Sequence, residues 1–165
     1  MSVTIHSERP DTNDASKLIL ELEALLSPMY PEESRHGYSI NKLIEQKVEF
    51  FIIRHHGEAV GCAGVQIFEG QDSLAYGEVK RMYVRPGFRG LGLARLLLKQ
   101  LEQTAAARGV TILRLETGIH QLEAVRLYER YGFKRIGPFG DYRDDPLSIY
   151  FEKPVPLIGP HKNGS

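Results

Sequence analysis

Basic residues gather in one stretch of a chain that is otherwise neutral. Between Lys80 and Arg95 the sequence has five basic residues and no acidic one, although the chain of 165 residues balances 21 Lys and Arg against 21 Asp and Glu. The overall positive field on which nucleic-acid and membrane binders rely is therefore absent. Any recognition by charge must be local, and we expect neither nucleic acid nor a membrane as partner.

A glycine-rich turn, VRPGFRGLGLA, lies inside this basic stretch. Gly90 and Gly92 let the backbone approach a ligand closely, and a helix beginning after them directs unpaired N–H groups and its positive dipole end outward. These features together predict an anion cradle. The alternative is a tight strand-to-helix connection with a solvated basic face. A Walker A motif is excluded because no Gly-Lys-Ser/Thr follows, and the Rossmann spacing is also absent.

The length and composition predict one domain over residues 1–154 and a loose tail over 155–165, which is rich in proline, glycine and polar residues. The single cysteine, Cys62, excludes an internal disulfide framework. No apolar run approaches the ~20 residues of a membrane helix, and the first residues lack the apolar core of a signal peptide. We therefore expect a cytoplasmic protein.

Hydrophobic periodicity and turn residues predict the element order β-α-α-β-β-β-α-β-α-β-β. The predicted strands are Val3–Ser7, Phe50–Arg54, Ala59–Phe68, Leu74–Val84, Val110–Thr117, Phe133–Ile136 and Ser148–Glu152. The first predicted helix has leucines at positions 18, 22, 25 and 26 and is capped by Asp14 or Ser16. The other predicted helices are Ile40–Gln46, Gly90–Arg108 and Gln121–Tyr131. A turn at Glu69–Asp72 would join the third and fourth strands.

Two segments resemble a known family. RGLGLA, from Arg89 to Ala94, matches the R/Q-x-x-G-x-G/A signature of the GNAT N-acetyltransferases, and AVRLYERYGF, from Ala124, resembles the family's A-x-x-L-Y-E-x-x-G-F segment. The two motifs occur in the family's order. Two further segments are similar to a bacterial YsnE-type branch of these acetyltransferases. They are LETG, which ends at Gly118, and PFG-x-Y-x-x-DPLS, which begins at Pro138.

The resemblance implies a single α/β domain with a mixed, mostly antiparallel sheet of about seven strands flanked by about four helices. It also implies acetyl-CoA as co-substrate and a cleft between two parting parallel strands whose unpaired backbone groups can bind the pantetheine arm. No metal is expected, because His55 and His56 lack a metal-ligand spacing. The cofactor-binding positions carried over are Met82, Tyr83, Val84, Arg89, Gly90, Leu91, Gly92, Leu93, Ala94 and Gln121, the last standing where many members have Asn.

Acetyl transfer to an amine requires a base, because an alkylammonium with a pKa of about 10 is protonated at pH 7. Glu78 matches the place where several family members carry a glutamate base. Strand alternation would put it on one face with Lys80, Met82 and Val84. The alternative for Glu78 is an ion pair with Lys80 or Arg81.

Glu116 is the second candidate base, because LETG places a carboxylate where the cleft should open. The alternative is that this carboxylate caps a helix or fixes a loop.

Tyr128 matches the family's tyrosine general acid, which would return a proton to the CoA thiolate, although it also lies on an apolar helical stripe typical of core. Cys62 has no neighbouring base in the sequence, so direct transfer in a ternary complex is the predicted mechanism.

The acceptor should be held by two loops over the cleft, at residues 30–36 and 139–143. The candidate residues are Tyr30, Arg35, His36, Tyr142 and Arg143, a set that suits a carboxylate beside an aromatic surface, or an ordinary mixed-charge rim. The predicted activity is acetylation of a primary amine on a small, carboxylate-bearing molecule, by a chain that could form a homodimer. The alternatives are a protein or peptide N-acetyltransferase and a non-catalytic acyl-CoA-binding module.

Overall fold

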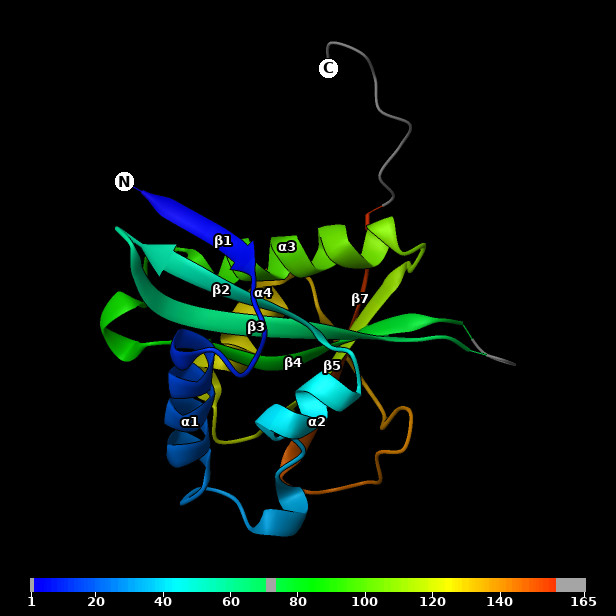
Figure 1. Ribbon diagram of the computed structural model, residues 1–165. Helices are drawn as coiled ribbons and strands as arrows, with labels where there is room; N and C mark the ends of the chain where they lie inside the picture. Colours follow the sequence, from blue (N-terminus) through cyan, green and yellow to red (C-terminus); the bar gives the residue numbers. More distant parts are fainter. Residues whose placement is uncertain (1, 71–73, 157–165) are drawn as a thin grey trace, which may run out of the picture.

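A seven-stranded mixed sheet forms the centre of the computed structural model, which describes residues 2–70 and 74–156 (Figure 1). Its strand order is β1-β2-β3-β4-β5-β7-β6, and only β4 and β5 pair in parallel. The strands are β1 (Val3–Ser7), β2 (Glu49–His55), β3 (Glu58–Phe68), β4 (Tyr76–Val84), β5 (Ile112–Gly118), β6 (Lys134–Ile136) and β7 (Ser148–Pro154). The helices are α1 (Asn13–Leu26), α2 (Ile40–Glu45), α3 (Leu93–Ala107) and α4 (Leu122–Tyr131). The predicted fold class and element order are confirmed.

Helices cover both faces of the sheet, as Figure 1 shows. On one face, α3 and α4 form the main core with the sheet, and Leu97, Leu98 and Leu101 of α3 are fully buried. On the other face, α1 and α2 pack through Leu18 and Leu43. Each fully buried leucine contributes roughly 1.5–3 kcal/mol to folding, so the leucine spacing in the sequence decides which side of each helix meets the sheet.

The cap of α1 differs from the prediction of Asp14 or Ser16. Thr12 is the cap: its backbone is extended, and its hydroxyl accepts a hydrogen bond from the Ala15 amide at 3.2 Å. Asp14 lies inside the first turn, where its negative charge is favourable near the helix dipole, and it pairs with Arg54 at 2.8 Å. Since three neighbouring residues can each cap a helix, only the backbone conformation of the preceding loop distinguishes them.

The parallel pairing of β4 with β5 is short. Only Gly77 with Leu113 and Glu78 with Arg114 are in register, after which the two strands part. On its other side, β5 remains paired with β7 along its whole length. The sheet is therefore split between β4 and β5, where backbone groups of both strands lack a strand partner.

A β-bulge interrupts β4 just before this split. Cys62 of β3 faces Tyr83 and Gly64 faces Lys80, so β4 has one more residue than β3 over this interval. Arg81 takes up the extra residue with a left-handed backbone, φ 54°. A bulge shifts the alternation of side chains by one position.

The bulge separates residues that strand alternation alone would place on one face. Lys80 lies over the ring of Tyr38, on the side of α1 and α2, whereas Met82 and Val84 pack in the core formed by α3. The prediction that Glu78 shares a face with Met82 and Val84 is wrong, because the extra residue at Arg81 inverts the pattern beyond Lys80.

The predicted turn at residues 69–72 and the predicted tail at residues 155–165 are only partly described by the structure. Residues 71–73 of the predicted turn and 157–165 of the predicted tail lie outside the described residues. Val155 packs into the main core, and its amide donates a hydrogen bond to the Thr111 carbonyl at 2.8 Å. None of the described helices combines the length and the apolar character needed to cross a membrane.

Candidate active site

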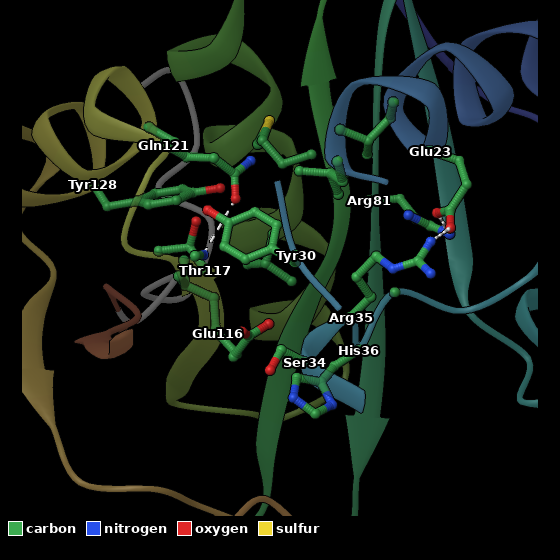
Figure 2. A pocket seen from close by; sticks show the side chains of 18 residues that line it. Glu23, Tyr30, Ser34, Arg35, His36, Arg81, Glu116, Thr117, Gln121 and Tyr128 are labelled. Carbon is green, nitrogen blue, oxygen red and sulfur yellow. Dashed lines mark hydrogen bonds and ion pairs between the residues drawn. The ribbon is translucent and has the colours of Figure 1, made fainter. Parts of the chain in front are cut away.

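A small cavity of about 100 Å³ lies where β4 and β5 part (Figure 2). Four parts of the chain meet there: α1 with the loop that follows it, β4, β5 and the start of α4. The lining includes Glu23, Tyr30, Ser34, Arg35, His36, Arg81, Met82, Glu116, Thr117, Gln121 and Tyr128. Since titratable groups from separate elements converge on one half-open cavity at a split in the sheet, this cavity is the candidate active site.

Two carboxylates line the cavity in the described residues: one is Glu23, which is ion-paired with Arg35 and Arg81, and the other is Glu116. It lies on β5, and the Ser148 hydroxyl of β7 donates a hydrogen bond to its Oε2 at 2.7 Å. Burial raises the pKa of Glu116 to about 7, because removal from water disfavours the ionised form more than the Ser148 hydrogen bond favours it. A carboxylate with this pKa can both accept and release a proton near neutral pH.

Tyr128 lies on α4, and Figure 2 shows its hydroxyl directed into the cavity. The side chain is only 5% exposed and packs against Phe133 and Phe151. Burial raises the pKa of Tyr128 above its usual value, so the hydroxyl remains protonated at neutral pH. The residue is therefore part of the core and of the cavity wall at once, and the two interpretations of its sequence position are compatible.

The junction between β5 and α4 is fixed by Gln121 and Tyr30. The Gln121 side-chain oxygen accepts a hydrogen bond from the Gly118 amide at 3.2 Å, and the Tyr30 hydroxyl accepts one from the His120 amide at 3.1 Å. A Cβ atom at Gly118 would overlap the ring and hydroxyl of Tyr30, so any other residue there would displace Tyr30. This contact explains the last residue of the LETG segment.

The glycine-rich turn presents free backbone amides at the start of α3. Gly90 and Gly92 have left-handed φ angles of 82° and 79°, and neither would bring an added Cβ within 4 Å of another atom. Within the described ranges, the amides from Gly90 to Arg95 donate to no backbone carbonyl. This open row of N–H groups at a helix N-terminus fits a pyrophosphate.

The side chains around the turn support it in different ways. Arg89 folds back and donates from Nε to the Val84 carbonyl at 3.1 Å, which ties the turn to the end of β4. Leu93 is buried and anchors the first turn of α3, Ala94 is half-buried, and Leu91 is exposed. At these positions the backbone, more than the side chains, is available to a ligand.

Of the three predicted cofactor contacts on β4, one faces the cavity with its side chain, and the other two can offer only backbone groups. The Met82 side chain lines the cavity. Tyr83 points to the opposite face, where its hydroxyl donates to Glu21 at 3.2 Å, and Val84 is in the main core. Tyr83 and Val84 can therefore meet a cofactor in the split through their backbone groups.

Glu78 is held in a buried ionic network outside the residues that line the cavity. Its side chain is 3% exposed and pairs with Lys80 Nζ at 2.8 Å. The Tyr142 hydroxyl also donates to its Oε2 at 2.5 Å. The structure thus contains the ion pair with Lys80 that the sequence left open as the alternative for Glu78.

The acceptor candidates are only partly brought together. Tyr30, Arg35 and His36 line the cavity, and burial lowers the pKa of His36. Tyr142 packs edge-on against His36 with ring centres 5.1 Å apart, but it is outside the lining. Arg143 is exposed, and its carbonyl accepts a hydrogen bond from the Tyr150 hydroxyl at 2.7 Å.

Sequence reasoning missed Glu23, Ser34 and Arg81 as cavity residues. The sequence places Arg81 in the basic stretch and offers it as a possible ion-pair partner of Glu78, but it reaches the cavity because of the bulge in β4. Glu23 lies on α1, where the leucine spacing gives no sign that a polar residue faces a site. Ser34 lies next to the candidates Arg35 and His36, and that adjacency was the one available signal.

Cys62 has the properties of an inert thiol. It is fully buried, its Sγ lies 3.3 Å from the Arg81 carbonyl, and burial raises its pKa to about 12. In the described residues, no group of three or more His, Cys, Asp or Glu could hold a metal ion.

A model of the acetyltransferase (GNAT) family matches residues 19–133. The chain belongs to the GNAT family. It is 42% identical to IAA acetyltransferase of Azospirillum brasilense over 93% of this chain and 99% of that one. It is 32% identical to N-acetyltransferase YsnE of Bacillus subtilis (76% and 82% covered) and 29% to aminoalkylphosphonate N-acetyltransferase of Salmonella typhimurium (79% and 83% covered). A crystal structure from Klebsiella pneumoniae, assigned to the acyl-CoA N-acyltransferases, matches with a TM-score of 0.77 and 36% identity over 93% and 97% of the chains.

The predicted family, enzyme class and co-substrate are therefore confirmed. The chain is an acetyltransferase that uses acetyl-CoA, and the split sheet and the open amides of the turn fit that molecule. The roles of individual residues and the identity of the acceptor remain predictions.

Proposed function

We propose that the chain transfers the acetyl group of acetyl-CoA directly to the primary amine of a small molecule that also bears a carboxylate. The observation that carries the proposal is Glu116, a carboxylate with a pKa of about 7 that faces the same small cavity as the protonated hydroxyl of Tyr128. These are the two groups that an amine acceptor and a thiolate leaving group require.

In this proposal acetyl-CoA supplies an activated acyl carbon, and the residues of the chain manage charge and protons. Glu116 takes the proton from the acceptor ammonium, which leaves a neutral nitrogen to form the new C–N bond. As the C–S bond breaks, Tyr128 gives its proton to the departing thiolate. The nitrogen loses its second proton as the amide forms, and this proton restores the Tyr128 hydroxyl. The amides from Gly90 to Ala94 hold the pyrophosphate, and the backbone of β4 at Tyr83 and Val84 orients the pantetheine arm.

Transfer is direct in this proposal because the chain's cysteine cannot act as a nucleophile. The Cys62 thiol stays protonated, since burial raises its pKa to about 12, and it is fully enclosed. Both substrates must then occupy the site together.

The size of the cavity supports a small acceptor. At about 100 Å³ it is well below the ~300 Å³ at which sites for drug-sized ligands begin. Two relatives point the same way, since the names IAA acetyltransferase and aminoalkylphosphonate N-acetyltransferase specify small molecules. A homodimer, a cytoplasmic location and the absence of a nucleic-acid partner remain predictions from the sequence.

The test is a screen for CoA thiol release from acetyl-CoA with a panel of amino acids, simple amines and peptides. We expect the fastest release with a small amino-carboxylate, in equal amount to an N-acetylated product detected by mass spectrometry. Efficient acetylation of peptides over every small amine would instead favour a protein acetyltransferase. No release with any amine, from a chain that binds acetyl-CoA by calorimetry, would indicate a non-catalytic module.

A further inference from the structure

Two arginines in the cavity wall share a single carboxylate. Arg35 Nη1 lies 3.1 Å from Glu23 Oε1, and Arg81 Nη2 lies 2.8 Å from Glu23 Oε2 (Figure 2). The three residues come from three places: α1, the loop after it and the bulge in β4. We call Arg35 and Arg81 the arginine pair, and Glu23 its carboxylate.

The pair has more positive charge and more N–H groups than its surroundings satisfy. Within the described part of the chain, Glu23 is the only carboxylate in ion-pair distance of either arginine. The Arg35 Nε is buried and has no hydrogen-bond partner there. An unpaired buried donor of a charged group is unfavourable by roughly 1–3 kcal/mol or more, so this corner of the cavity favours a second oxyanion.

The position of Arg81 is built into the fold. Its side chain is 5% exposed, and its Nε donates to the Tyr38 carbonyl at 3.0 Å. Its backbone has the left-handed φ of 54°, which non-glycine residues seldom adopt, and a Cβ at Gly37 would overlap its guanidinium. A strained backbone that the surrounding structure holds in place is typical of functional sites.

We infer that the arginine pair binds the carboxylate of the acceptor and thereby selects amines that carry one, an inference that rests on the proposed function. Figure 2 shows the pair on one side of the cavity and Glu116 on the other. An acceptor with its carboxylate at Arg35 and Arg81 would place its amine toward Glu116. Guanidinium groups suit this task because their planar N–H groups match a carboxylate.

The test compares matched substrates on matched variants. The substrates are amino acids and their decarboxylated amines: phenylalanine with phenethylamine, leucine with isoamylamine, and β-alanine with ethylamine. We expect Arg35→Ala to raise the KM of the carboxylate-bearing acceptors at least about tenfold and to leave the KM of the matched amines and of acetyl-CoA within about twofold. Arg108→Ala is the control, because Arg108 also pairs with a glutamate, Glu49, but is exposed at the far end of α3. Equal losses on both members of each substrate pair would overturn the inference.

The carboxylate of Glu23 gives a test with the opposite sign. Glu23→Gln removes the charge that neutralises the pair while keeping a hydrogen-bonding side chain, so we expect the KM of the carboxylate-bearing acceptor to fall. A rise as large as that of Arg35→Ala would show that Glu23, not the pair, contacts the acceptor, and would overturn the inference.

A binding measurement separates this inference from the proposed function. The same amino acids are titrated calorimetrically into the CoA-loaded chain and into its Arg35→Ala variant. Binding that depends on Arg35 without any acetyl transfer would contradict the proposed function and support the arginine pair. Acetyl transfer to amino acids whose affinity does not depend on Arg35 would contradict the arginine pair alone.

Discussion

At the scale of single residues, two carboxylates compete for the role of base, and their surroundings distinguish them. Glu78 is already paired with Lys80, whereas Glu116 faces the cavity with a raised pKa. We expect Glu116→Gln to lower turnover roughly 10²-fold at pH 7 and to bind acetyl-CoA normally. Thiol-release kinetics and calorimetry measure the two effects.

The matching change at the other carboxylate should act on stability. Glu78→Gln leaves the Lys80 ammonium buried without its partner, which we expect to lower the free energy of unfolding by about 3 kcal/mol. Denaturant titration of both variants provides the comparison. If Glu78→Gln folds as well as wild type and loses activity that returns at high pH, the base is Glu78 and the assignment of Glu116 is wrong.

The raised pKa of Glu116 also predicts how activity depends on pH. The base must be ionised, so kcat/KM should rise with pH and level off above about 7, where the folded-state pKa lies. In Glu116→Gln the levelling-off near pH 7 should be absent, and the lowered kcat/KM should keep rising with pH toward the pKa of the free amine, about 10. A profile that is flat from pH 5.5 to 8 in the wild type would contradict the role of Glu116.

The same shift has a consequence for stability with a definite sign. In the folded state Glu116 keeps its proton up to about pH 7, whereas in the unfolded state it loses the proton near the ordinary pKa of a glutamate. The wild type therefore loses stability as the pH rises from the unfolded-state pKa to the folded-state pKa. Glu116→Gln removes this loss, and its free energy of unfolding at pH 8 should exceed that of wild type by up to about 3 kcal/mol. The advantage should disappear below about pH 4.5, which denaturant titrations at both pH values can show.

For the proton donor, the sharpest change is Tyr128→Phe, which removes a hydroxyl and keeps the buried ring. We expect turnover to fall roughly 10- to 10²-fold and acetyl-CoA affinity to stay within about twofold. Tyr131→Phe is the control on the same helix, since the Tyr131 hydroxyl bonds to Glu102 away from the cavity. Wild-type turnover in Tyr128→Phe would leave Tyr128 with a packing role only.

At the scale of elements, the two ends of α3 provide a matched test of the anion cradle. Gly92 begins the helix and Gly109 follows its end; both are left-handed, and neither has an atom within 4 Å of an added Cβ. A Glu substitution at either site introduces the same left-handed strain, roughly 1–2 kcal/mol. Only Gly92→Glu puts a negative charge beside the proposed pyrophosphate position, so we expect it alone to abolish acetyl-CoA binding by calorimetry. Equal affinities in the two folded variants would rule out the cradle.

The bulge in β4 is the element that the sequence could not reveal. Strand alternation is a property of β4 alone, but the bulge exists only relative to β3, where Cys62 and Gly64 set the pairing. No glycine marks the position, since the left-handed residue is Arg81. The face of Glu78 and the presence of Arg81 in the cavity both depend on this register, and both were missed for that reason.

At the scale of the whole molecule, the features that could be predicted are those set by local pattern. The leucine spacing of α3, the hairpin turn before Glu58 and the glycine-rich turn are each encoded in a short stretch of sequence. The element order could therefore be predicted from the sequence, whereas the role of the glycine-rich turn as an anion cradle stays a prediction. The acceptor side could not be predicted in the same way. Arg35 meets Arg81 and Glu23 only because α1, its following loop and β4 converge, whereas Arg143, in the second predicted loop, remains exposed.

In the proposed reaction, acetyl transfer occurs directly between two substrates held together in the split of the sheet. The measurement that tests it most directly is the initial rate of CoA release over a grid of acetyl-CoA and acceptor concentrations. We expect intersecting lines in the double-reciprocal plot, because both substrates must be bound before the proton leaves toward Glu116. Parallel lines, together with an acetylated enzyme detected by mass spectrometry in the absence of acceptor, would contradict it.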